Sequence, residues 1–186
     1  YSMMVDKYEV KQYISDTLGT KYVIPTLGKW SSVDDIDFDL LPNQFVLKCN
    51  HDSKSTVICK NKNDFDIRQA KNKLESHIKN NAFWYGREWP YKSIKPCIIA
   101  EKYMVDEEHG DLFDYKVLCF NGKAKLIQVY MGRNSNNLTQ DFYTAKWEKT
   151  LNDISKGKSK KNEFLNEMKN YSKTIVKEIK NSENKF

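Results

Sequence analysis

A lysine ends one of the most apolar segments of the chain. Lys48 follows the apolar residues 45–47, and the polar stretch NHDSKS at 50–55 comes before a second apolar segment at 56–59. Burying an ammonium group is costly unless it reaches water along the protein surface or meets an anion. Lys48 therefore either extends into solvent at the end of its strand or binds an anionic ligand.

Charged residues also occupy two strands predicted further along the chain. Because side chains alternate between the faces of a strand, Asp114 and Lys116 lie on one face of the predicted strand 112–120. Glu101 and Lys102 directly follow a short apolar run. Taken singly, each charge fits a surface position, where an ion pair contributes about 0–1 kcal/mol. Taken together, the lysines, the polar turn and a strand-end carboxylate suit a polyphosphate ligand that carries a purine.

The four cysteines occur singly, among β-branched or aromatic neighbours. Such isolated cysteines are typical of reduced packing residues in a cytosolic protein. The alternative is a metal site formed by Cys49, His51 and Cys59, but their spacing matches no common zinc module. We therefore assign no metal ligand to these residues.

The composition is that of a folded chain with a modest positive charge. It has 186 residues, 39% of them hydrophobic and 13% aromatic, and a formal net charge of +6. Residues 149–186 contain ten lysines and five acidic residues, so most of the excess charge lies there. Because these lysines alternate with asparagines and acids, they indicate a solvated helix face rather than an arm that binds nucleic acid or an anionic membrane.

The first half of the chain predicts helices around one β-hairpin. Apolar residues recur at helical spacing from Ile67 to Ile78, and the apolar segments on either side of the polar turn predict two paired strands. The expected elements are a helix over 5–18 that ends at Gly19, an extended segment over 22–28, strands at about 44–50 and 55–61, and a helix over 67–78 capped by Asp64 or Asp66.

The second half predicts strands followed by a helix. Strands are expected at about 97–104, 112–120 and 123–131, and Asn121-Gly122 predicts a two-residue hairpin turn between the last two. An apolar stripe between Phe164 and Ile179 predicts a C-terminal helix. This mixed order of elements indicates the α+β class.

Several segments of the chain resemble one known family. They are DKY at 6–8, YVIPTLG at 22–28, LPNQFVLKCNHDS at 41–53, REWPY at 87–91, IIAEKY at 98–103, DYK at 114–116, CFNG at 119–122 and QV at 128–129. In register from about residue 1 to residue 147, the chain resembles the TupA-like ATP-grasp proteins of teichuronopeptide biosynthesis. The resemblance implies an ATP-grasp-like fold, in which two α/β subdomains with antiparallel hairpins enclose a nucleotide cleft. We place the first subdomain at 1–96 and the second at 97–186.

The resemblance also implies which residues bind the phosphates of ATP. Lys7 and Lys48 resemble the two lysines that contact phosphate groups in the family. The polar turn, which contains Asn50, His51 and Ser53, resembles the flexible lid loop that covers the phosphates. Lys48 would then end its apolar strand because it binds a phosphate there.

A second set of candidates follows from the same resemblance. Glu101, Lys102 and Tyr103 resemble the hinge that reads adenine, mostly through backbone groups. The remaining candidates, which would face the phosphates or the acceptor substrate, are Asp114, Lys116 and Arg133. Of these, Lys116 and Arg133 are the residues expected to act in catalysis.

Two features depart from the family pattern. Lys54 stands where relatives usually have glycine, so it either stiffens the loop or adds a cation. The family cofactors are ATP and Mg²⁺, but the family's magnesium carboxylates lie on later strands, which are expected beyond Phe186. The sequence is therefore expected to be cut short before them.

Family members are often encoded with capsule or surface-polysaccharide genes. We therefore expect a ligase that uses ATP to activate a carboxylate for attack by an amine, with a glycan or amino-acid acceptor. The alternatives are a glycosyltransferase that uses a nucleotide sugar and a noncatalytic nucleotide-binding protein. Without a membrane span or a signal-peptide core, the chain is expected to be cytoplasmic. Its expected partners include membrane-bound polysaccharide machinery, with which it would associate peripherally, and no nucleic acid.

Overall fold

The computed structural model describes residues 1–105, 110, 112–132 and 138–151. The chain divides into two compact units, Tyr1–Tyr103 and Met104–Phe186, and each is described by itself. The first unit extends beyond the expected subdomain boundary at residues 96 and 97, because the strand at 98–102 pairs within its sheet. The expected subdomain division stays a prediction.

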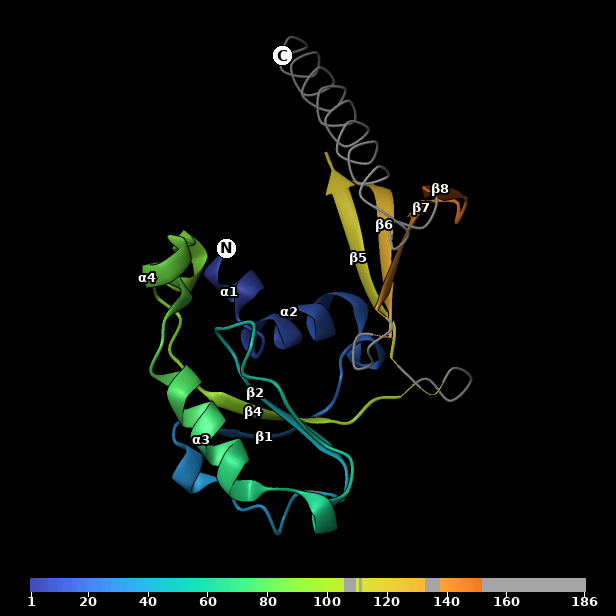
Figure 1. Cartoon of the computed structure of the whole chain (residues 1–186). Helices are drawn as coiled ribbons and strands as arrows, with labels where there is room; N and C mark the ends of the chain where they lie inside the picture. Colours follow the sequence, from blue (N-terminus) through green and yellow to red (C-terminus); the bar gives the residue numbers. More distant parts are fainter. Residues whose placement is uncertain (106–109, 111, 133–137, 152–186) are drawn as a thin grey trace. The chain divides into compact units, whose positions relative to one another are not determined.

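The first unit contains a four-stranded antiparallel sheet (Figure 1). Its strands are β1 (Thr26–Trp30), β2 (Phe45–Cys49), β3 (Val57–Cys59) and β4 (Ile98–Lys102), in the spatial order β1-β4-β2-β3. β4 therefore lies between β1 and β2, and both of its edges are occupied. The hairpin of β2 and β3 confirms the strand pair predicted around the polar turn.

The first unit contains four α-helices, of which the second and third lie at or near the positions expected from the sequence. They are α1 (Ser2–Val5), α2 (Glu9–Leu18), α3 (Ile67–Ile78) and α4 (Ala82–Gly86), with 3₁₀ turns at Thr20–Tyr22, Val33–Asp35, Lys62–Asp64 and Trp89–Tyr91. The Asp66 side chain accepts a hydrogen bond from the backbone N–H of Gln69, which confirms the predicted cap of α3. Gly19 ends α2 with a φ of 104°, as expected for a glycine cap.

The helix predicted over 5–18 is wrong at its start. Asp6 separates α1 from α2, and its Oδ1 accepts hydrogen bonds from the backbone N–H groups of Tyr8 (2.8 Å) and Glu9 (3.2 Å). A short carboxylate in this position satisfies N–H groups that have no partner within the helix. The break sets Lys7 outside both helices.

The two faces of the first sheet differ in chemistry. Phe45, Leu47 and Cys49 are completely buried and belong to one apolar core together with Leu74 of α3. The side chains between them in β2 point to the other face and are only half-buried, as the two-residue period of a strand requires. Lys48 is one of them, so it lies on the face opposite the apolar core. Figure 1 shows α2 and α3 on opposite sides of this sheet.

The second unit contains another four-stranded antiparallel sheet. Its strands are β5 (Asp114–Phe120), β6 (Lys123–Met131), β7 (Thr139–Thr144) and β8 (Lys149–Leu151), in sequence order. Asn121 and Gly122 have φ values of 48° and 71°, which confirms the predicted hairpin turn. β7, β8 and α4 were not predicted, and the helix expected from Phe164 to Ile179 lies outside the described residues. The protein is thus a mixed α+β chain with two antiparallel sheets, as expected.

Candidate functional site

A buried carboxylate lies between two lysines on the polar face of the first sheet. Glu101, in the central strand β4, is 4% exposed. Its Oε1 lies 2.5 Å from the Nζ of Lys11 in α2, and its Oε2 forms an ion pair with the Nζ of Lys48 in β2. The β2–β4 register places Val46 opposite Glu101 and Ile99 opposite Lys48, so Lys48 reaches Glu101 diagonally on the same face.

Lys11 is held by more than its ion pair. Its Nζ donates hydrogen bonds to the carbonyl oxygen of Ile24 (2.7 Å) and to Oγ1 of Thr26 (3.1 Å). These contacts join α2 to the start of β1 and fix the ammonium group next to Glu101. This role of Lys11 was not predicted from the sequence, because a lysine on a short amphipathic helix usually faces solvent.

Lys7, in the segment between α1 and α2, contacts the turn that follows β2. Its Nζ donates to the carbonyl oxygens of Asn50 (3.3 Å) and Asp52. Burial lowers the pKa of Lys7 from 10.5, the charge of Asp52 opposes this effect, and the nearby charge of Lys48 lowers the pKa further. Lys7 therefore lies beside the turn that follows Lys48, and an anion bound there would offset the unfavourable effect of the two positive charges.

Asn50, expected in the lid loop, joins three segments of the first unit. Its Nδ2 donates to Oδ2 of Asp6 (2.9 Å) and to the carbonyl oxygen of Lys95 (3.1 Å), while its Oδ1 accepts from the backbone N–H of Cys97 (2.9 Å). The residue is 1% exposed. Its side chain thus fixes the base of the hairpin tip, and a direct side-chain contact with a ligand would require breaking these bonds.

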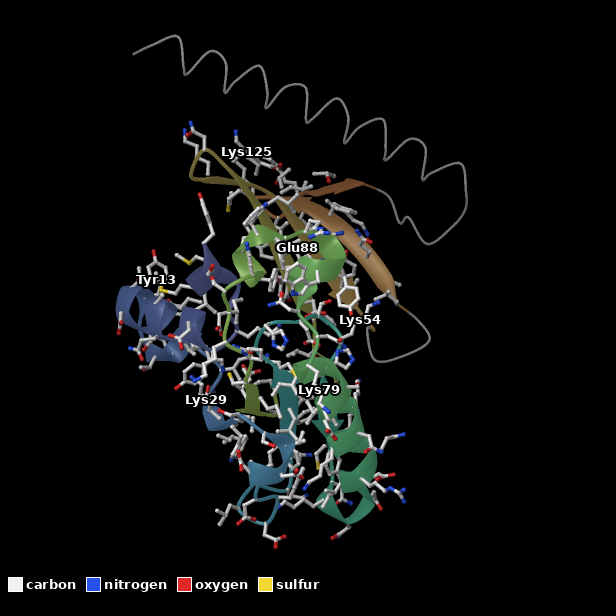
Figure 2. All side chains as sticks on the ribbon, turned by 90° about the vertical axis from the view of Figure 1, so that its left-hand side faces the viewer. Tyr13, Lys29, Lys54, Lys79, Glu88 and Lys125 are labelled. Atoms are coloured by element: carbon white, nitrogen blue, oxygen red, sulfur yellow. The ribbon has the colours of Figure 1, made fainter. Side chains whose placement is uncertain are left out.

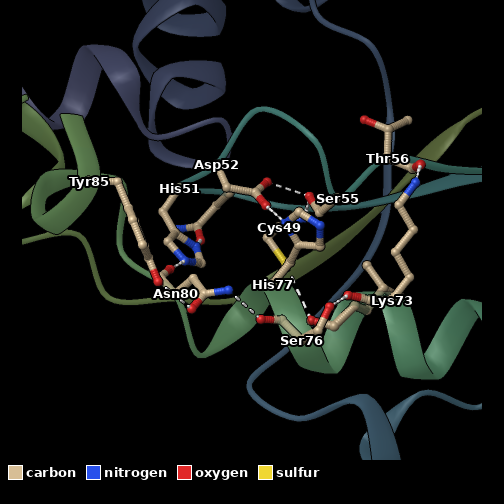
Figure 3. Close-up of polar contacts among 12 residues, drawn as sticks. Cys49, His51, Asp52, Ser55, Thr56, Lys73, Ser76, His77, Asn80 and Tyr85 are labelled. Atoms are coloured by element: carbon tan, nitrogen blue, oxygen red, sulfur yellow. Dashed lines mark hydrogen bonds and ion pairs between the residues drawn. The ribbon is translucent and has the colours of Figure 1, made fainter.

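His51 is also buried inside the protein. It is 0% exposed, and its Nε2 lies 2.5 Å from the carbonyl oxygen of Asn80 (Figure 3). Its Nδ1 lies 3.2 Å from Oδ1 of Asn50. The histidine side chain therefore fastens the tip to the end of α3. Its expected place in the ATP site stays a prediction.

Asp52 fastens the same tip through a second contact that the sequence did not suggest. Its carboxylate accepts a hydrogen bond from Oγ of Ser55 and pairs with Nδ1 of His77 in the last turn of α3 at 2.5 Å (Figure 3). Ser55 in turn accepts a hydrogen bond from the backbone N–H of Cys49 (2.8 Å). Ser53 and Lys54, between these anchors, are exposed. Lys54 is labelled in Figure 2.

The expected adenine hinge continues the central strand. The backbone N–H of Lys102 donates to the carbonyl oxygen of Pro25 (3.0 Å), so this amide already has a partner in the sheet. The Lys102 side chain is exposed and Tyr103 is half-buried. Of the three expected hinge residues, only Glu101 places its carboxylate between Lys11 and Lys48 in the described contacts. The role of Glu101, Lys102 and Tyr103 in binding adenine stays a prediction.

The second unit contains the remaining candidates. In the β5–β6 register, Asp114 lies opposite Tyr130 and Lys116 lies opposite Gln128. The Nζ of Lys116 lies 5.1 Å from the centre of the Tyr130 ring, so Lys116 leans toward the position of Asp114 on the face they share. Arg133 lies outside the described residues.

The cysteines of the first unit are packing residues. Burial raises the pKa of Cys49 to about 12 and that of Cys97 to about 11, which keeps both thiols protonated near neutral pH. Within the described part of the chain, no group of three or more histidine, cysteine, aspartate or glutamate side chains could hold a metal ion. In the same residues, no helix has both the length and the apolar character needed to cross a membrane.

Comparison with known proteins gives one match that covers nearly the whole chain. The family described as TupA-like ATPgrasp matches residues 1–181, which extends past residue 147, where the similarity of individual motifs was expected to end. Segments of the chain are also similar to proteins named DNA topoisomerase 3. The Bacillus thuringiensis protein is 56% identical over 43 residues, which make up 23% of this chain and 6% of the topoisomerase.

The other topoisomerase matches are also partial. The Bacillus licheniformis protein is 45% identical over 51 residues, 27% of this chain and 7% of the topoisomerase. The Staphylococcus epidermidis protein is 43% identical over 128 residues, 67% of this chain and 17% of the topoisomerase. The chain thus spans only a small part of these relatives, and no solved structure matches it. On the family match over residues 1–181, the chain belongs to the TupA-like ATP-grasp family.

Proposed function

We propose that this protein acts as an ATP-grasp ligase in bacterial surface-polysaccharide biosynthesis. ATP would activate a carboxylate as an acyl phosphate, which an amine of the acceptor then attacks. Either the carboxylate or the amine would belong to a glycan precursor. Family membership supports the use of ATP, and the arrangement of lysines in the first unit supports the position of its phosphates.

The single observation that carries the proposal is that Lys7 and Lys48 meet at one turn of the first unit. Lys48 precedes this turn, and the Nζ of Lys7 donates to the carbonyl oxygens of Asn50 and Asp52 within it. The two residues come from segments 41 positions apart, yet the charge of Lys48 lowers the pKa of Lys7. Two ammonium groups held close together in a partly buried region favour a multivalent anion, because it can accept charge-assisted hydrogen bonds from both. A polyphosphate has this property.

Binding of ATP would change the partners of both lysines. The Nζ of Lys48 would exchange the carboxylate of Glu101 for a phosphate oxygen, and the Nζ of Lys7 would add a phosphate oxygen to its two carbonyl partners. The exposed tip at Ser53 would offer backbone N–H groups to the same phosphates. Asn50 and His51 would act by fixing the base of this tip.

The other residues of the proposal bind the rest of the ligands. Backbone groups of Glu101, Lys102 and Tyr103 would contact adenine at the end of β4. From the second unit, Asp114 and Lys116 would serve the phosphates or the acceptor, as would Arg133. Mg²⁺ bound with ATP would neutralise developing charge on the phosphates. It prefers carboxylate and water oxygens, and since the described residues contain no candidate metal group, we assign none of them to it.

The topoisomerase matches support no second function. The matched segments make up 6% to 17% of the three topoisomerases named above, so their name carries no activity over to this chain. We therefore propose no activity on nucleic acid.

The experiment that tests the proposal is calorimetric titration of ATP into the wild type, Lys7→Met and Lys48→Met. Each substitution removes a charge-assisted contact with a phosphate, and such contacts contribute about 1.5–3 kcal/mol, so each should weaken binding by about tenfold or more. Lys71→Met is the matched control, because Lys71 lies on α3 and pairs with the exposed Asp34 at 3.3 Å. Unchanged ATP affinity in both test variants would contradict the proposal.

A further inference from the structure

Two lysine ammonium groups pair with the single buried carboxylate of Glu101, although one positive charge would be enough to neutralise it. An ionised carboxylate at 4% exposure requires a partner, because removing a lone charge from water is expensive. One lysine would neutralise it, yet both Lys11 and Lys48 form ion pairs with it, one to each oxygen. The three groups together carry a net positive charge.

The two lysines differ in how firmly they are held. The Nζ of Lys11 has two further hydrogen bonds to the protein, to Ile24 and Thr26, and its side chain is 14% exposed. The Lys48 side chain is 21% exposed, and Glu101 is the one hydrogen-bonding or ion-pair partner that the described contacts give its Nζ. Lys11 is therefore the fixed counter-ion of Glu101, and Lys48 is the one that can leave.

We infer that Lys11 is a positioning residue that makes Lys48 available to an anionic ligand by sharing the buried carboxylate of Glu101. This inference rests on the proposed role of Lys48 in binding ATP phosphates. When Lys48 turns to a phosphate, Lys11 continues to neutralise Glu101, so no unpaired charge is left in the sheet. Without Lys11, Glu101 depends on Lys48 alone and competes with the ligand for it.

Two other roles for Lys11 must be separated from this one. Lys11 could contact the phosphate itself, or it could act only as a structural link between α2 and β1 through Ile24 and Thr26. In either case the loss of Lys11 should have the same effect whether or not residue 101 carries a charge. In the role that we infer, the effect depends entirely on the charge of Glu101.

A double-mutant cycle on Lys11 and Glu101 separates the inferred role from direct phosphate contact and from a purely structural link. ATP is titrated calorimetrically into the wild type, Lys11→Met, Glu101→Gln and the double variant. We expect Lys11→Met to weaken ATP binding by about tenfold, the size of one charge-assisted contact, in the wild-type background. In the Glu101→Gln background the same change should alter the affinity by less than about twofold, because Lys48 no longer has an anionic competitor. Lys11→Arg should retain most of the wild-type affinity, since it keeps the charge.

A second readout does not involve ATP. Nuclear magnetic resonance of the ¹⁵N-labelled lysine ammonium groups reports how quickly the Lys48 protons exchange with water. In the ATP-free protein with Lys11→Met, these protons should exchange more slowly than in the wild type, because Glu101 holds Lys48 alone. Lys11→Gln provides the same comparison if the methionine variant unfolds, and thermal unfolding of each variant monitors the structural link.

The titrations and the proton-exchange measurement each have a result that would contradict the inferred role of Lys11. Equal weakening by Lys11→Met in both backgrounds, no weakening in the wild-type background, or unchanged exchange of the Lys48 protons would overturn it. Failure of the proposed function has a different signature, because Lys48→Met would then leave ATP affinity unchanged. The control Lys71→Met should change neither readout.

Discussion

Replacing Asn50 with alanine should destabilise the first unit strongly. The side chain makes hydrogen bonds to Asp6, Lys95 and Cys97, of 2.9, 3.1 and 2.9 Å respectively, at a position that is 1% exposed. Alanine would leave the backbone N–H of Cys97 and one oxygen of the buried Asp6 carboxylate without this partner. Each buried group that loses its partner costs about 1–3 kcal/mol, so we expect a loss of about 3–5 kcal/mol in the free energy of unfolding.

Urea denaturation followed by circular dichroism measures this loss. A change of that size is a large part of the total stability of a domain, which is about 5–15 kcal/mol, so the midpoint should fall clearly while the slope stays the same. Asn63→Ala is the control, because Asn63 is exposed, and it should change stability by less than about 0.5 kcal/mol. A loss below about 1 kcal/mol for Asn50→Ala would refute the view that this residue anchors the hairpin tip.

Three further predictions follow from single residues. Because burial lowers the pKa of Lys7 below 10.5, the folded chain releases this proton at a lower pH than the unfolded chain, and Lys7 contributes stability that rises with pH up to about 10.5. The raised pKa values of Cys49 and Cys97 act in the opposite direction in both proteins, so the measured quantity is the stability of the wild type minus that of Lys7→Met, which should increase with pH in urea titrations at several pH values. Gly122→Ala should cost about 1 kcal/mol, measured by thermal unfolding, because Gly122 has a φ of 71°. At pH 8, Cys119 should react with iodoacetamide before Cys49, because Cys119 is exposed whereas Cys49 is buried with a pKa raised to about 12; mass spectrometry after brief labelling would contradict this if Cys49 were modified first.

The elements that the sequence predicted well are those fixed by local chemistry. The helical spacing from Ile67 to Ile78 and the cap at Asp66 depend on residues within one turn of each other, and both are present. The Asn121-Gly122 turn needs two positive φ values, which these residues adopt more readily than others. The face of Lys48 also follows from the period of its own strand.

The parts that the sequence did not predict depend on distant partners. Glu101 is buried because β4 is the central strand of its sheet, and its neighbour Lys11 is 90 positions away in the sequence. The pairing of Asp52 with His77 likewise joins a turn to the end of a helix 25 positions later. Side-chain periodicity describes one element at a time, so it can give the face of each residue but not the partner across the fold.

The expected lid loop contains two residues whose burial was not predicted from the sequence. Asn50 and His51 stand in a polar turn, and polar turns are usually exposed. Here both side chains are buried because backbone groups near Lys95, Cys97 and Asn80 offer them hydrogen-bond partners. The sequence therefore indicated the location of the tip correctly but not which of its residues face solvent.

The central claim is that Lys7 and Lys48 contact the phosphates of ATP, and affinity labelling tests it most directly. An acyl-phosphate derivative of ATP transfers its acyl group to a lysine amine held next to the terminal phosphate, and mass spectrometry then identifies the acylated residue. We expect acylation of Lys48 or Lys7 that excess ATP suppresses, while any labelling of the surface residue Lys71 stays insensitive to ATP. Labelling of Lys7 and Lys48 that is absent, or that excess ATP leaves unchanged, would contradict the claim.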